Sequence, residues 1–223
     1  MGQDLTITAS DGFTFDAYKA TPSGKPRGAV VVVQEIFGVN AHIRETADLF
    51  AALGYTAIAP ALFDRAQKKV NLGYTPEDIA KGREFVPKSD WAKVILDVDA
   101  TIKNVASAGK VGIVGYCWGG TVAWLAACRA QGLSASSSYY GGGVANFASE
   151  TAKCATILHF GDKDKGIPIE AVEKVRAAQP KCPVYRYPLG DHGFNCDHRS
   201  TFHGPSALLA LGRTVQLFGQ QLG

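Results

Sequence analysis

The chain has 223 residues, of which 46% are hydrophobic and 19% are charged, and its formal net charge is +3. This length and apolar content suit one domain with a substantial core, so we expect residues 1–223 to form a single domain. The basic residues are dispersed, which excludes a nucleic-acid-binding footprint, and no apolar run reaches the about 18 residues of a membrane-spanning helix.

The first predicted elements form a hairpin. Segments 5–8 and 13–20 flank the turn signal Asp11-Gly12 and read as two antiparallel strands. Ser136–Tyr140 is a more polar candidate strand, predicted from its place between two helix-like stretches. Continuous apolar runs, the pattern of strands buried on both faces, are found at Ala29–Val33, Thr56–Ala59, Val111–Val114, Thr156–Phe160 and Val184–Tyr187.

Helix-like stretches separate the strands. They cover Ala41–Leu53, Trp91–Val105, Trp118–Gln131, Ile169–Ala178 and Ser206–Gly219. Buried strands that alternate with helices imply right-handed crossovers, and therefore an α/β fold with a mostly parallel sheet and helices on both faces. Residues 64–88 are the least regular stretch, and we expect a cap or a mobile loop over a site there.

A nucleophile turn follows the strand that ends at Val114. Its sequence, Gly115-Tyr116-Cys117-Trp118-Gly119, is the Gly-x-nucleophile-x-Gly pattern with cysteine in place of serine. The turn forces its central residue into strained φ/ψ angles, and a helix N-terminus favours the thiolate there. The Trp118 amide would supply half of an oxyanion hole. A buried inert thiol and a phosphate-binding turn are the alternatives, but the glycine and lysine pattern of a phosphate loop is missing.

The base of such a site should be a histidine near the end of the chain, because the order in this fold is nucleophile, acid, histidine. His192 lies in a glycine-flanked loop after the last strand and is the first candidate, with His198 second. We interpret His42, in an amphipathic helix, and His159, inside an apolar strand, as structural.

Two aspartates compete for the acid. Asp162 and Asp164 both lie on the loop that follows Thr156–Phe160. Ligands and catalytic groups in open α/β sheets gather beyond the carboxyl ends of the strands, a condition that both residues meet. The residues alone therefore leave both open.

Glu35 is the unusual residue, since it directly follows the most apolar strand. Neighbouring parallel strands end side by side, so its carboxylate should lie near Cys117. Either it forms an ion pair with a residue such as Arg44, or it is a second base or hydrogen-bond partner for the thiol. The amide of Ile36 would complete the oxyanion hole.

Over nearly its whole length the sequence resembles the dienelactone hydrolase (carboxymethylenebutenolidase) family, cysteine members of the α/β-hydrolase fold. The resemblance implies that Cys117 is the nucleophile, His192 the base and Asp164 its orienting acid. It also implies that Glu35 holds or deprotonates the resting thiol. The motifs that carry it are Gln34–Asn40, Arg44–Thr46, Gly112–Gly120, Tyr139–Gly141, Gly161-x-x-Asp164-x-x-Ile167-Pro168 and His192–Phe194.

The chain departs from the family pattern at the residues that bind a substrate carboxylate. Some members carry a serine and an arginine where this chain has Gly193 and Cys196. Other branches have an arginine seven residues after the histidine, which Arg199 matches. Arg83, with Lys81 nearby, is the candidate for a second carboxylate-binding cation.

These features predict a hydrolase that opens activated lactones or enol esters, in the degradation of aromatic compounds, through a thioester on the cysteine. The alternatives are a general carboxylesterase or thioesterase and a catalytically silent binding protein. We expect a small-molecule lactone or ester as the only partner class, with no nucleic acid or membrane, and a monomer rather than an obligate oligomer. Triad hydrolysis implies no metal and no organic cofactor.

The cysteines indicate the compartment. There are five, an odd number, and their wide spacing shows neither a Cys-x-x-Cys pair nor a Cys-His cluster for zinc or redox chemistry. Residues 1–6 lack the basic and apolar regions of a secretory signal. Reduced thiols in a cytoplasmic protein are therefore the expectation.

Overall fold

The computed structural model describes residues 2–223 and contains one eight-stranded sheet, in the order β1-β2-β4-β3-β5-β6-β7-β8. β2 pairs antiparallel with both β1 and β4, and all other neighbours pair in parallel. The predicted α/β class with a mostly parallel sheet is thereby confirmed. The strands are β1 (Gln3–Thr8), β2 (Thr14–Ala20), β3 (Ala29–Val33), β4 (Thr56–Pro60), β5 (Val111–Tyr116), β6 (Leu133–Tyr139), β7 (Ala155–Gly161) and β8 (Val184–Tyr187).

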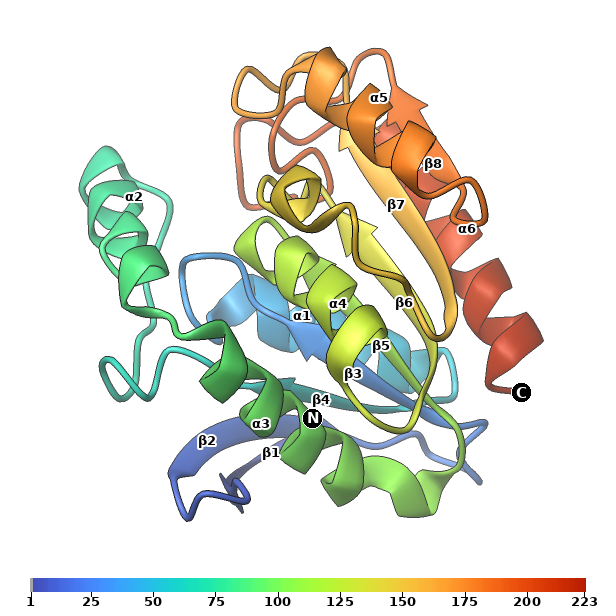
Figure 1. Cartoon of the computed structure of the whole chain (residues 1–223). Coiled ribbons are helices and arrows are strands. Elements are labelled where there is room, and N and C mark those ends of the chain that lie inside the picture. The colour runs from blue at the N-terminus through green and yellow to red at the C-terminus, as the bar shows by residue number, and fades with distance from the viewer. Residues whose placement is uncertain (1) are drawn as a thin grey trace.

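Helices cover both faces of the sheet. Figure 1 shows α3, α4 and α5 on one face and α1 and α6 on the other. On the second face, Phe50 of α1 packs against Phe218 of α6, with ring centroids 5.8 Å apart. The helices are α1 (Ala41–Ala52), α2 (Pro76–Arg83), α3 (Trp91–Val105), α4 (Trp118–Arg129), α5 (Ile169–Ala178) and α6 (Gly204–Gln221), with short 3₁₀ turns η1 (Val86–Lys88), η2 (Ala106–Ala108) and η3 (Val144–Phe147).

The polar strand β6 is longer than predicted and lies in the middle of the sheet. Ser136, Ser137 and Ser138 are fully buried but hydrogen-bonded: for example, Ser136 donates to the Ala123 carbonyl at 2.9 Å, and Ser138 donates to the Gly120 carbonyl at 2.8 Å. Both carbonyls belong to α4. Buried hydroxyls are tolerated when they are paired, which is why a serine-rich segment can form a central strand against this helix.

Residues 64–88 are more regular than predicted, because they contain α2 and η1. A capping box starts α2: the Thr75 hydroxyl accepts from the Asp78 amide, the Asp78 carboxylate accepts from the Thr75 amide, and Pro76 occupies the first turn. These are helix-start signals that the sequence carried. In Figure 1, α2 stands out from the body of the molecule.

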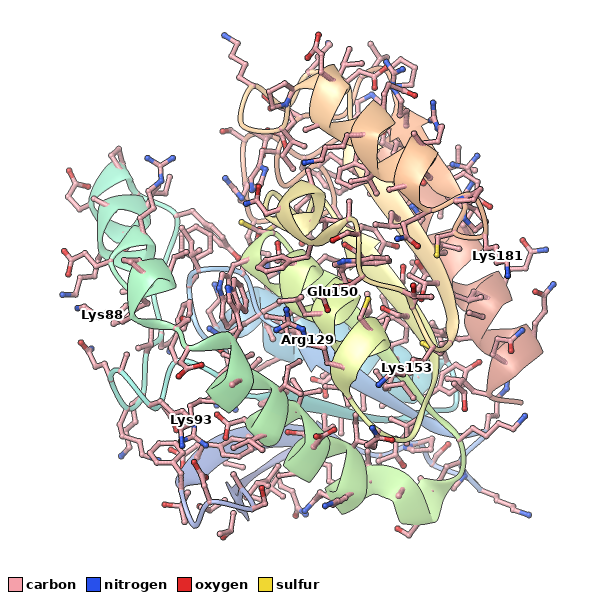
Figure 2. All side chains as sticks on the ribbon, viewed as in Figure 1. Lys88, Lys93, Arg129, Glu150, Lys153 and Lys181 are labelled. Carbon is pink, nitrogen blue, oxygen red and sulfur yellow. The ribbon has the colours of Figure 1, made fainter. Side chains whose placement is uncertain are left out.

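An ion pair fixes the segment that follows β6. Arg129 Nε, at the end of α4, donates to the Glu150 carboxylate at 2.8 Å, just beyond η3. Figure 2 shows these two side chains meeting on the face that carries α4. Within residues 2–223, none of the helices combines the length and the apolar character that crossing a membrane requires.

Candidate active site

The turn between β5 and α4 has the strained geometry expected of a nucleophile turn. Cys117 has φ 56° and ψ −118°, a conformation that side-chain-bearing residues rarely adopt. A Cβ at Gly115 would collide with the Gly119 carbonyl, and a Cβ at Gly119 would collide with the Gln34 carbonyl. The two glycines therefore allow β5, the turn and the end of β3 to approach one another closely.

A hydrogen-bonded chain runs from Cys117 across the end of the sheet. Its Sγ lies 3.0 Å from His192 Nε2, and His192 Nδ1 lies 2.6 Å from Asp164 Oδ2. The other Asp164 oxygen accepts from the Gly166 amide at 2.8 Å, which holds the carboxylate in place. Asp162 points elsewhere and accepts from Arg186 at 2.7 Å. Of the two candidate acids, Asp164 is the one that contacts the histidine.

The charges around His192 favour its protonated form. Burial lowers the pKa of this imidazole, but the Cys117 thiolate and the Asp164 carboxylate outweigh burial and hold the pKa well above its usual range. An imidazolium beside a sulfur stabilises the thiolate, which is the reactive form of cysteine. The arrangement can therefore provide both an attacking thiolate and a proton donor.

Glu35 follows β3, whose Val33 pairs with Gly115 before the turn, and is 1% exposed. Arg199 Nη1 donates to Glu35 Oε1 at 3.1 Å. The ion pair that the sequence suggested with Arg44 is not formed, because Arg44 pairs with Asp4 at 2.8 Å instead. The partner of Glu35 is an arginine 164 residues away, on the loop that also carries His192.

A cavity of about 410 Å³ opens above the sulfur. Cys117, His192 and Arg199 line it together with Arg83, and its remaining wall is mostly apolar, with Ile36, Phe37, Ile79, Val86, Trp91, Trp118 and Phe147. The Ile36 and Trp118 amides donate to no backbone carbonyl in the turns and loops of residues 2–223. Both residues face the same cavity, so their N–H groups are available for an oxyanion.

The other sequence candidates lie away from the sulfur. His198 Nε2 lies 2.7 Å from Glu45, at the surface. His159 is fully buried, with its ring nitrogens 2.8 Å from the Tyr187 hydroxyl and 3.2 Å from Ser137 Oγ. Lys81 pairs with Glu84 at 3.0 Å and does not line the cavity.

Tyr140 is a residue that the sequence reasoning did not assign to the site. It is fully buried with φ 38°, and its ring centroid lies 5.3 Å from that of His192. Backbone strain of this kind gathers at functional sites. The only sequence signal was the motif Tyr139-Tyr140-Gly141.

Within residues 2–223, two groups of side chains offer atoms that metal ions bind. One group is buried and consists of Glu35, His42 and Cys196, and the other is exposed and consists of Glu45, Asp197 and His198. Both lie around the loop that carries Arg199. Neither group contains the Cys-x-x-Cys pair or the Cys-His cluster of a sequence-encoded zinc motif.

We expect iodoacetamide to alkylate Cys117 alone near neutral pH. Burial raises the pKa of the other four thiols, to about 12 for Cys128 and Cys196, so that they stay protonated and unreactive. Peptide mapping after partial alkylation should find the label on Cys117 in step with the loss of activity. Label on Cys154 or Cys182 at comparable rates would contradict the expectation.

The chain is similar in sequence and in structure to proteins of one known family. A model of the dienelactone hydrolase family matches residues 15–222. A protein from Synechocystis with the provisional name carboxymethylenebutenolidase is 36% identical over 86% of this chain and 86% of its own length. A protein of that name from Escherichia coli K12 is 34% identical over 98% of this chain and 87% of its own. The crystal structure of a protein provisionally named dienelactone hydrolase from Klebsiella pneumoniae superposes with a TM-score of 0.87, at 31% identity over 99% of both chains.

Proposed function

Because the chain belongs to the dienelactone hydrolase family and is a hydrolase, we propose that it opens activated lactones or enol esters through a thioester on Cys117. The observation that carries the proposal is the continuous contact from Cys117 through His192 to Asp164 at the wall of one cavity. A nucleophile, a base and an orienting carboxylate in that order are the minimum set for acyl transfer.

In the acylation step, the Cys117 thiolate attacks the carbonyl carbon of the ester. The amide N–H groups of Ile36 and Trp118 donate to the oxygen that becomes negative. The tetrahedral intermediate then collapses, the bond between the acyl carbon and the leaving oxygen breaks, and the imidazolium of His192 gives its proton to that oxygen. The product of this step is a thioester, and the alcohol or enol is released or, in a lactone, stays attached.

In the deacylation step, His192 is neutral and takes a proton from water. The hydroxide attacks the thioester carbon, and collapse of the second intermediate expels the Cys117 thiolate. His192 keeps the proton, which restores the starting ion pair. Asp164 orients the ring through Nδ1 in both steps and stabilises its positive charge.

We assign the recognition of an anionic substrate to Arg199, with Arg83 on another part of the cavity wall. A substrate carboxylate would compete with Glu35 for the Arg199 guanidinium, since Glu35 Oε1 now accepts from it. Glu35 follows β3, whose Val33 pairs with Gly115 at the nucleophile turn. A released Glu35 carboxylate can accept the proton of the fraction of Cys117 that is still a thiol, so that binding of the substrate completes the formation of the thiolate that His192 stabilises.

A general carboxylesterase is the second candidate, and the apolar wall of the cavity favours it. Trp91, Trp118 and Phe147 line the cavity, and the rings of Trp91 and Trp118 stack with centroids 5.9 Å apart. Such a surface suits neutral aryl or alkyl esters that carry no carboxylate. The two candidates differ in how much the arginines contribute to selectivity.

Arg199→Gln is expected to lower kcat/KM for an anionic enol-lactone by roughly ten- to a hundredfold relative to a neutral aryl ester, since a hydrogen bond to a charged group is worth about 1.5–3 kcal/mol. Taking the ratio of kcat/KM for the two substrates cancels any general loss of activity that is caused by leaving Glu35 without its partner. Arg83→Gln, measured with the same two substrates, shows whether the second arginine of the cavity wall also contributes to this selectivity. If both substrates lose equally in Arg199→Gln and Arg83→Gln, the general carboxylesterase is the better description.

A further inference from the structure

Three buried side chains from distant parts of the sequence converge next to the active-site cavity. Glu35 follows β3, His42 lies on α1, and Cys196 lies on the loop before α6. A carboxylate oxygen, an imidazole nitrogen and the Sγ lie within 4.8 Å of one another, and all three residues are at most 4% exposed. Carboxylate, imidazole and thiolate are ligands of Zn²⁺, which in proteins takes four of them or three and a water.

Two of these residues have polar atoms without a partner. Glu35 Oε2 and His42 Nδ1 are fully buried, and neither makes a hydrogen bond within the part of the chain that the structure describes. A buried polar atom left unpaired destabilises the folded protein, because it has lost its hydrogen bonds to water without gaining others. A cation bound between them would satisfy both atoms at once.

The second polar atom of each of these two residues faces a charged side chain. Glu35 Oε1 accepts from Arg199 at 3.1 Å, and His42 Nε2 faces the Asp197 carboxylate at 3.9 Å. Metal-binding histidines typically direct their second nitrogen to a carboxylate or a carbonyl, and metal-binding carboxylates are hydrogen-bonded in turn. Glu35 Oε2 and His42 Nδ1 are therefore the atoms of these two residues that a metal ion could bind without displacing another group of the described chain.

The third residue is supported in a similar way. Cys196 Sγ lies 3.3 Å from the Tyr74 hydroxyl, and Asn40 Nδ2 lies 3.1 Å from the same oxygen. When Cys196 is a thiolate, the Tyr74 O–H can turn and donate to it. The thiolate that zinc requires would then have a hydrogen-bond donor already in place.

A second cavity, also of about 410 Å³, lies beside this cluster, and Cys117 does not line it. His42 and Tyr116 lie on its wall together with Glu45 and Asp197. The two carboxylates make this entrance attractive to cations. A metal ion can therefore reach His42 without passing through the active-site cavity.

We propose that Glu35, His42 and Cys196 form a zinc-binding site that inhibits the hydrolase. Binding replaces the S–H bond of Cys196 by a zinc–sulfur bond and releases the proton to water, with no change of oxidation state. Zinc on Oε2 would hold Glu35 in place, so that it could not accept the proton of Cys117. The inhibition rests on the proposed function, whereas the binding site does not.

Cobalt titration of the Cys117→Ala protein tests the site directly. This variant removes the nucleophile, which could itself bind a soft metal, and the readout is the absorption of Co²⁺ rather than activity. We expect tetrahedral d–d bands and a thiolate-to-cobalt charge-transfer band that saturate at one Co²⁺ per chain and disappear when Zn²⁺ is added.

Cys196→Ser in the same background should abolish the charge-transfer band, and His42→Gln should weaken binding at least about tenfold. Cys182→Ala, which removes another buried thiol, is the matched control and should bind as before. Circular dichroism will show whether each variant is folded. Absence of one-to-one binding, or a charge-transfer band that survives in a folded Cys196→Ser protein, overturns the site. Zinc binding without inhibition of the unmodified enzyme overturns only the inhibitory role.

Discussion

Cys117→Ala is expected to lower kcat/KM for activated esters by roughly 10⁴- to 10⁶-fold, as removal of a triad nucleophile does in other hydrolases. Cys117 Sγ lies 3.0 Å from His192 Nε2, and Cys117 lines the active-site cavity. No other thiol or hydroxyl of the described chain is hydrogen-bonded to this histidine. The substitution removes one half-buried thiol at the surface of a cavity, so we expect folding to be unaffected.

Cys128→Ala is the matched control, because Cys128 is a buried thiol on the same helix that does not line the cavity. It should keep activity within a few-fold. Steady-state kinetics on one aryl ester and one enol-lactone check both variants. A Cys117→Ala protein that keeps more than a tenth of the wild-type activity would show that the nucleophile lies elsewhere.

Asp164→Asn is expected to lower kcat by roughly 10³- to 10⁴-fold, the effect of making the same change in serine triads. The neutral amide carries no charge to stabilise the imidazolium, and its NH2 group can donate to Nδ1 instead of accepting from it, which favours the wrong tautomer of the ring. The substitution also removes one of the two charges that raise the pKa of His192. The limb of the pH profile that reports this imidazole should therefore move to lower pH.

Asp162→Asn separates this effect from general damage to the loop. Asp162 is two residues away and pairs with Arg186 at the surface, where an ion pair is worth about 0–1 kcal/mol. Its variant should keep kcat within a few-fold and leave the pH profile in place. Equal losses in both variants, or an unchanged pH profile in Asp164→Asn, would contradict the assignment.

The strained turn at Cys117 and the position of His192 beside it were predictable because each follows from local rules. A strand, a Gly-x-Cys-x-Gly turn and a helix determine one another over a few residues, and the observed φ of 56° at Cys117 is the strain that this pattern requires. His192 follows from chain order and from its place after the last strand. The residues next to Cys117 and to His192 in the sequence are therefore enough to place both side chains at the end of the sheet.

The choice between Asp162 and Asp164 was beyond the residues alone. Both follow β7, and what separates them is the path of the turn, in which Asp164 accepts from the Gly166 amide and faces His192. Side-chain direction in such a loop depends on contacts with a segment that begins about 25 residues later. Only the resemblance to the family favoured Asp164.

Long-range pairing explains the other differences. One of the two alternatives for Glu35 was an ion pair with Arg44, which is close in sequence, whereas the observed partner is Arg199. The group of Glu35, His42 and Cys196 likewise joins three separate segments and follows no short motif. By contrast, α2 was locally encoded by its capping box and by Pro76, and it was missed because the polar composition of residues 64–88 suggested a loop.

Intact-protein mass spectrometry of the enzyme during turnover tests the central claim most directly. The enzyme is mixed with a slowly hydrolysed aryl ester and quenched in acid at short times, and the modified peptide is then mapped. We predict the mass of one acyl group on the peptide that contains Cys117, forming and decaying at rates that account for kcat. Full turnover with no acyl adduct at any time, or an adduct on another residue, would contradict cysteine-based catalysis in this protein.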